Sequence, residues 1–173
     1  MWYKNVRAQN ILILLFALFG IASTFYYVNL KPQLSPMEKH QIHQSVFSNI
    51  LSYIAEHPNE DPEYFFISVS SSDPSSRLLN DFAHNIPTVK PASSSEMSYG
   101  FSSYVSLKSD QSKRGLLVDL KVMGKQPNGN VQVLASLYKS RSRSATYEYI
   151  LNENSGSYQI ISFKGSQRSE FLE

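Results

Sequence analysis

The chain of 173 residues contains no cysteine. This absence excludes disulfide bonds, thiolate nucleophiles and cysteine-based zinc sites. An excess of one charge is also missing, because Lys4 and Arg7 precede the first apolar run and residues 31–173 carry 14 basic and 14 acidic side chains. A formally neutral domain lacks the basic surface of a nucleic-acid-binding protein. We therefore expect no nucleic acid among its partners.

Recognisable catalytic patterns are absent as well. The chain is rich in serine, but it has no G-x-S-x-G motif and no serine with an evident histidine and aspartate arrangement. His40 and His43 lie three residues apart, a helical spacing at which two imidazoles can share a metal. No nearby carboxylate is an evident third ligand, so a polar helix face is the simpler interpretation. We expect no catalytic residue, no metal and no cofactor, and we keep an enzyme as the alternative.

One feature that is present is a long apolar run, since no charged residue lies between Arg7 and Lys31. Residues 10–30 would span about 31 Å as a helix, which matches a hydrocarbon core of about 30 Å. We predict a transmembrane anchor at 10–30, with the lipid bilayer as a partner. The alternative is a signal peptide that is cleaved after Ala22 or Ser23.

The charges around this run predict its orientation. Lys4 and Arg7 lie close to the apolar run, within a short N-terminus of residues 1–9 that is easily left in the cytoplasm. The prediction is a single-pass protein of a bacterial inner membrane, whose domain is periplasmic or extracellular.

Residues 31–36 form a predicted linker, and a long helix is expected to follow. Ser35 and Glu38 have the spacing of a capping box, and Pro36 suits the first helical position. The apolar residues that recur at three- and four-residue intervals are Ile42, Val46, Phe47, Ile50, Leu51 and Ile54. Their single stripe predicts a helix that packs against a larger element.

The next segments predict a strand and a short helical excursion. Residues 64–69 are aromatic and β-branched, as in a strand. Asp73 is expected to cap a short helix that begins at Pro74, and Pro91 is expected to steer the chain into the next strand. The motifs Asp73-Pro74-Ser75 and Pro91-Ala92-Ser93 would then mark the entry and the exit of this excursion.

The remainder alternates between apolar and polar residues, with an Asn128-Gly129 hairpin signal. It predicts an antiparallel meander, so residues 37–165 would form an α+β domain, followed by a flexible tail at 166–173. The expected fold is an N-terminal transmembrane helix followed by a long helix packed on a curled antiparallel sheet, in the manner of a cystatin-like cone.

The order of several short motifs resembles a group of uncharacterised small bacterial proteins, secreted or membrane-anchored, that are similar to the NTF2-like architecture. The segments that carry the resemblance are Phe65–Val69, Asp73–Leu79, Pro91–Ser93, Lys113–Leu117 and Tyr147–Ile161, within residues 64–163. The group often has tryptophan where Tyr158 stands here, and it often has cysteines that this chain lacks. The resemblance implies the fold and carries over no catalytic residue.

Tyrosines provide the candidate ligand-binding residues. Five of them could line the open end of a curled sheet, as aromatic residues do in many pockets: Tyr104, Tyr138, Tyr147, Tyr149 and Tyr158. Two functions follow. The first is a non-catalytic, membrane-anchored interaction module that contacts a protein partner or a second copy of itself. The alternative is a small-ligand-binding or enzymatic cone domain, which a pocket holding a histidine or carboxylate with a perturbed pKa would favour.

Overall fold

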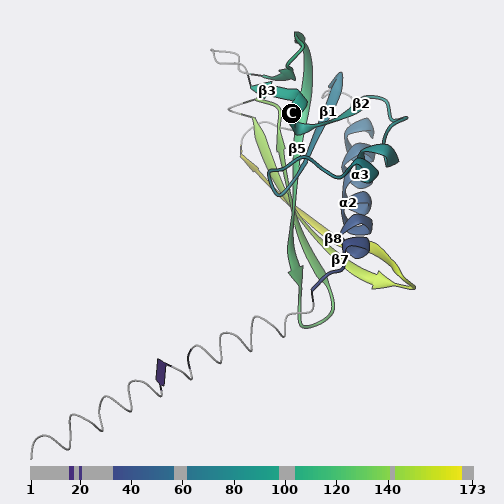
Figure 1. Ribbon diagram of the computed structural model, residues 1–173, viewed down its shortest axis with the longest axis vertical. Coiled ribbons are helices and arrows are strands. Elements are labelled where there is room, and N and C mark those ends of the chain that lie inside the picture. The colour runs from purple at the N-terminus through teal and green to yellow at the C-terminus, as the bar shows by residue number, and fades with distance from the viewer. Residues whose placement is uncertain are drawn as a thin grey trace, which may run out of the picture. The chain divides into compact units, whose positions relative to one another are not determined.

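Figure 1 shows the computed structural model, which describes residues 16–17, 20, 33–56, 62–97, 104–140 and 143–168. The chain divides into two compact units, Met1–Gln33 and Leu34–Glu173. Every element discussed below belongs to the second unit.

The predicted anchor at residues 10–30 lies outside the described residues, except for Phe16, Ala17 and Gly20. Within the described part of the chain, no helix combines the length and the apolar character that crossing a bilayer requires. This finding contradicts the predicted single-pass anchor and the predicted inner-membrane location. The prediction rested on the length of the apolar run and on the absence of charged residues between Arg7 and Lys31.

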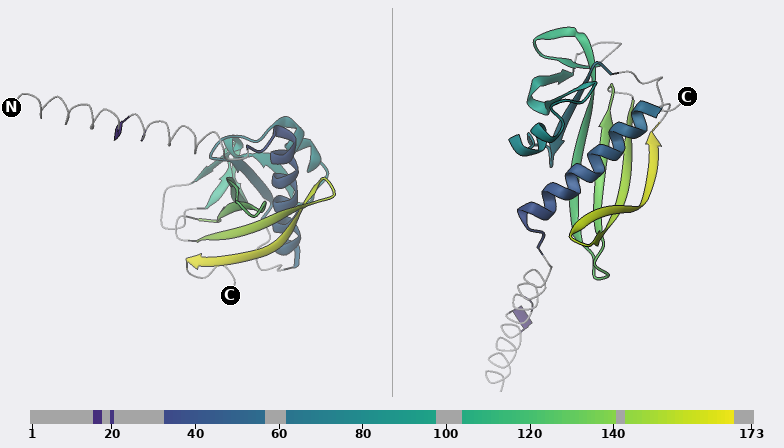
Figure 2. Two further views of the ribbon diagram at one scale, coloured as in Figure 1. Left: turned by 90° about the horizontal axis from the view of Figure 1, so that it is seen from below. Right: turned by 90° about the vertical axis from the view of Figure 1, so that its right-hand side faces the viewer.

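Helix α2 (Pro36–Glu56) begins as its capping box predicts. The Ser35 N–H donates to Glu38 Oε2 over 2.7 Å, and the Glu38 N–H donates to Ser35 Oγ over 3.2 Å. These reciprocal bonds satisfy two donors that the first helical turn would leave unpaired. The buried members of its apolar stripe are Ile42, Val46, Phe47, Ile50 and Ile54. Figure 2 shows α2 running diagonally across the strands.

In the described part of this unit, α2 is followed by eight strands, one short α-helix and one 3-10 turn. The strands are β1 (Tyr64–Val69), β2 (Thr88–Pro91), β3 (Ser95–Met97), β4 (Val105–Leu107), β5 (Asp110–Lys125), β6 (Val131–Tyr138), β7 (Ser144–Asn154) and β8 (Ser157–Arg168). The short helix is α3 (Ser76–Asp81), and the 3-10 turn is η2 (Ala92–Ser94). The main strand order is β2-β1-β5-β6-β7-β8, while β3 pairs with β4 and β4 also pairs with β5.

The sheet is mixed, because β1 runs parallel to both of its neighbours, β2 and β5. The other strand pairs are antiparallel. A parallel pair needs a crossover connection, and the segment that contains α3 supplies one between β1 and β2. The sequence patterns predict no strand at residues 88–91, where Pro91 marks only the exit of the helical excursion. The predicted fold class, an anchored helix on a curled antiparallel sheet, is therefore wrong.

The main core joins side chains of α2 and α3 to one face of the sheet. Alternate residues of β5, β6 and β7 enter it, as the two-residue period of a strand requires. Phe65 and Ile67 of β1 belong to this core, whereas Phe66 points to the other face and is fully buried. The Phe66 ring lies against Gly115 of β5, and a Cβ at that glycine would collide with it. This contact explains the glycine in the middle of a long strand.

Candidate functional site

A pocket of about 280 Å³ lies between the start of α2, the loop that follows β1, and α3. We call it the α2–β1 pocket. Its lining residues are Pro36, Lys39, His40, His43, Val69, Asp73, Pro74, Ser75 and Leu78. It lies at the carboxyl end of β1, the strand that is parallel to both of its neighbours. Ligands commonly bind beyond the carboxyl ends of parallel strands.

Helix α2 supplies one wall of the pocket. Lys39 and His43 lie four residues apart, so both project from the same side of the helix. The His40 Nε2 atom lies 2.9 Å from Asp81 Oδ2 at the end of α3. This contact helps to set the spacing between the two helices that flank the pocket.

The loop after β1 supplies the opposite wall, and its backbone is unusual. Ser70 and Ser71 have φ values of 52° and 61°, in the left-handed region that non-glycine residues seldom adopt. Asp119 of β5 supports this turn, because its Oδ1 accepts bonds from the Ser68 hydroxyl and the Ser71 N–H. Such strained backbone is often found at ligand sites.

The two Pro-Ser motifs of the sequence meet at this wall. Asp73 Oδ1 accepts the Ser93 N–H over 2.8 Å, which ties the start of the excursion to its end. Hydrogen bonds from the Ser93 side chain and backbone lower the pKa of Asp73. The prediction that Asp73 caps the short helix is wrong: α3 begins at Ser76, and the Ser75 hydroxyl caps it by accepting the Leu78 N–H.

His43 is the least satisfied polar residue of the pocket. It is 8 % exposed, and its Nε2 atom is buried without a hydrogen-bond partner. Burial, followed by the nearby charges of His40 and Lys39, lowers its pKa from 6.5 to about 4. His43 is therefore neutral at pH 7. A neutral imidazole can donate or accept a hydrogen bond at Nε2, depending on its tautomer.

The two helical histidines are not placed as a metal centre. Among the described residues, no group of three or more histidine, cysteine, aspartate or glutamate side chains could hold a metal ion. His40 is paired with Asp81, and Asp73 is engaged with Ser93. The arrangement is better suited to hydrogen bonding with an organic ligand than to metal ligation.

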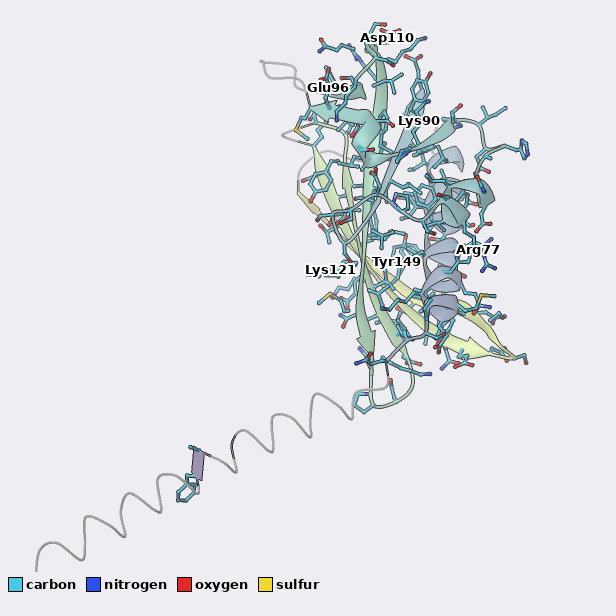
Figure 3. The ribbon with its side chains drawn as sticks, in the orientation of Figure 1. Arg77, Lys90, Glu96, Asp110, Lys121 and Tyr149 are labelled. Atoms are coloured by element: carbon cyan, nitrogen blue, oxygen red, sulfur yellow. The ribbon has the colours of Figure 1, made fainter. Side chains whose placement is uncertain are left out.

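The five predicted tyrosines are divided between different parts of the unit. Tyr147, Tyr149 and Tyr158 are buried in the main core, and Figure 3 shows Tyr149 directed towards α2. The Tyr158 hydroxyl donates to Glu38 Oε1 over 2.7 Å. Tyr104 and Tyr138 lie outside this core cluster, and Tyr104 packs against the guanidinium of Arg114 at 4.1 Å. The tyrosine-lined pocket stays a prediction.

No family model, curated protein or solved structure matches the chain. The resemblance to the NTF2-like group therefore stays a prediction. The histidines and the Pro-Ser motif that line the α2–β1 pocket were each visible in the sequence. The sequence did not show that these residues line one pocket. More than 25 residues separate His43 from Asp73, and the crossover from β1 to β2 was not predicted.

Proposed function

We propose that this protein is a binding module that takes a small polar ligand into the α2–β1 pocket. The observation that supports the proposal is the buried Nε2 atom of His43, which lacks a partner in a residue that lines the pocket. A buried polar group without a hydrogen bond costs about 1–3 kcal/mol. A ligand that bonds to this atom after the imidazole turns towards the pocket recovers that free energy on binding.

Binding is better supported than catalysis. A general base works best when its pKa lies near the working pH, whereas His43 has a pKa of about 4. It is a weak base at neutral pH, although it remains a good hydrogen-bonding group. The volume of about 280 Å³ is just below the range of roughly 300–1,000 Å³ that is usual for small-molecule sites. The ligand is therefore small.

The test is a screen of small polar compounds against the full-length chain, followed by NMR of the histidine side chains. We expect a subset of compounds to shift the His43 imidazole signals at millimolar concentration and to lose affinity in His43→Leu. Lys121→Gln is the matched surface control, because Lys121 lies on the face of the sheet that points away from α2 (Figure 3). If no compound moves the His43 signals, the pocket is not a binding site.

A second candidate function is self-association, and the position of β8 at one edge of the sheet among the described strands favours it. β8 stands at the end of the strand order, has 12 residues and contains no proline. The opposite edge strand, β2, has four residues and contains Pro91, which discourages pairing. Helix α2 bonds to the start of β8, where Ser45 Oγ donates to the Tyr158 carbonyl over 2.9 Å and the Tyr158 hydroxyl donates to Glu38 Oε1.

A second copy of β8 is a suitable partner for this edge. Antiparallel pairing centred on Ser162 would place Phe163 opposite Ile161 of the other copy, and these side chains are 52 % and 57 % exposed. Lys164 would then face Ile160 rather than a second lysine. The pairing thus covers apolar side chains without opposing like charges.

The absence of cysteine makes this second candidate easy to test. Residues that face each other across an antiparallel pair have Cα atoms about 4.5–5.5 Å apart, which is within reach of a disulfide. We expect Ser162→Cys to give a disulfide-linked dimer on mild oxidation, whereas Thr88→Cys on the β2 edge gives a monomer. Equal dimer yields from the two variants, or none from either, would exclude pairing through β8.

A further inference from the structure

We propose that the ligand of the α2–β1 pocket is a zwitterion of the size of a free amino acid. This inference rests on the proposed function and adds the chemical class of the ligand. The pocket carries a cation on its α2 wall and an anion on the wall that follows β1. A ligand with both charges is the one that matches the two walls together.

The α2 wall is suited to a carboxylate. Lys39 and His43 project from one side of the helix on adjacent turns. Among the described residues, Lys39 takes part in none of the ion pairs, which are His40–Asp81, Lys113–Glu63 and Lys125–Glu153. Its ammonium is therefore available to a ligand. A neutral His43 with its proton on Nε2 supplies a second donor, which would otherwise stay unpaired.

The opposite wall is suited to an ammonium group. Asp73 is held in its ionised form, because hydrogen bonds from Ser93 lower its pKa. An ionised carboxylate has about four lone-pair sites, and the bonds from Ser93 leave some of them free. Asp73 is also fixed in position by the link between the two motifs, so little side-chain freedom is lost when it binds a ligand.

The rest of the lining is suited to the short side chain of such a ligand. Val69 and Leu78 contribute apolar surface to the pocket. The rings of Pro36 and Pro74 contribute further apolar surface. The small volume excludes a long peptide from the pocket. A single amino acid places its two charges on opposite walls and its side chain on this apolar surface.

The experiment uses the full-length chain and three matched probes. Proteinogenic amino acids are titrated one at a time by calorimetry, and the tightest one is compared with its deaminated and its decarboxylated analogue. We expect each analogue to bind about 10-fold more weakly or worse, the usual effect of losing a hydrogen bond between charged groups. The site of binding is checked by the NMR shift of the His43 imidazole.

Two variants test whether Asp73 binds the ammonium group of the ligand and whether Lys39 binds its carboxylate. In Asp73→Asn the amino acid and its deaminated analogue should bind equally. In Lys39→Gln the preference for the amino acid over its decarboxylated analogue should become smaller, because only the His43 donor remains for the carboxylate. Asp110→Asn is the matched control for the first variant, because Asp110 accepts the same kind of bonds from Ser112 far from the pocket. Lys121→Gln is the control for the second. Both controls should retain the preference for the zwitterion.

The outcomes separate this inference from the proposed function. If an analogue with one charge shifts His43 and binds as tightly as the amino acid, the zwitterion class is wrong and the pocket remains a binding site. If no amino acid binds, the zwitterion class is also wrong. The proposed function itself fails only if the wider screen of polar compounds also leaves His43 unshifted.

Discussion

At the scale of single residues, burial gives the two helical histidines different chemistry. His40 stands at the edge of the pocket and is paired with Asp81. His43 also lines the pocket but is buried, and removal from water disfavours its charged form and lowers its pKa to about 4. The spacing of the two histidines alone is compatible with a shared metal site, which we did not predict. In the structure, His40 contacts Asp81, whereas His43 is a buried and neutral hydrogen-bonding group.

His43 predicts a specific dependence of stability on pH. Above pH 6.5 the residue is neutral in the folded and the unfolded chain, so it adds no pH dependence. Between about pH 6.5 and pH 4 the unfolded chain binds a proton that the folded chain does not, so the free energy of unfolding falls as the pH is lowered. The loss should reach about 3 kcal/mol at most.

Urea titrations of the full-length chain at pH 7, 5.5 and 4.5 measure this loss. His43→Gln should flatten the dependence over that range, because glutamine does not titrate. Glu38 has a pKa of about 2, held low by bonds from Tyr158 and Ser35, so the stability that it contributes is lost below pH 4.5, outside the tested range. An unchanged slope in His43→Gln would show that His43 is not the group responsible.

At the scale of elements, the starts of the two helices show which caps a short sequence pattern can predict. The capping box of α2 involves residues three apart, and the structure confirms it. The predicted cap of α3 is Asp73, but in the structure the cap is Ser75, two residues later. Ser75 has the role, because Asp73 is drawn to the Ser93 N–H twenty residues away. The long-range bond between Asp73 and Ser93 therefore determines which residue caps α3.

Ser75→Ala should consequently lower the free energy of unfolding by about 0.5–2 kcal/mol, the usual effect of losing a cap. Ser76→Ala is the matched control, since Ser76 is exposed and stands at the first helical position, where alanine is well tolerated. Denaturant titration of both variants gives the comparison. Equal losses in the two variants would mean that the Ser75 hydroxyl does not stabilise α3.

At the scale of the whole folded unit, α2, α3 and the sheet share one core. Phe47 of α2 is fully buried, and its ring meets that of Phe82 edge-on, with centroids 4.9 Å apart and planes at 77°. Phe82 follows directly after α3. This contact joins the long helix to the excursion that forms the pocket, so the pocket depends on the packing of the unit as a whole.

Phe47→Ala should lower the free energy of unfolding by about 3–5 kcal/mol, because it removes a fully buried ring and leaves a cavity. Met123→Ala, on a side chain that is 49 % exposed, should change it by no more than about 0.5 kcal/mol. Thermal and urea unfolding of both variants test the difference. A loss below about 1 kcal/mol for Phe47→Ala would contradict its place in the core.

The sequence by itself determined the features that depend on near neighbours. These are the start and the buried stripe of α2, the strand at residues 64–69 and the alternation that fills the core from β5, β6 and β7. Each follows from capping spacing or from the period of a helix or strand. The candidate histidines and the Asp73-Pro74-Ser75 motif were visible in the same way, as separate short patterns.

The tertiary structure alone decided how those pieces meet. The parallel placement of β2 beside β1 depends on the path of the chain, and four residues with a proline gave little sign of a strand. The same path brings Asp73 and His43 to one pocket and places His40 beside Asp81. Burial and long-range hydrogen bonds are properties of the packed chain, because they arise only when distant segments exclude water together.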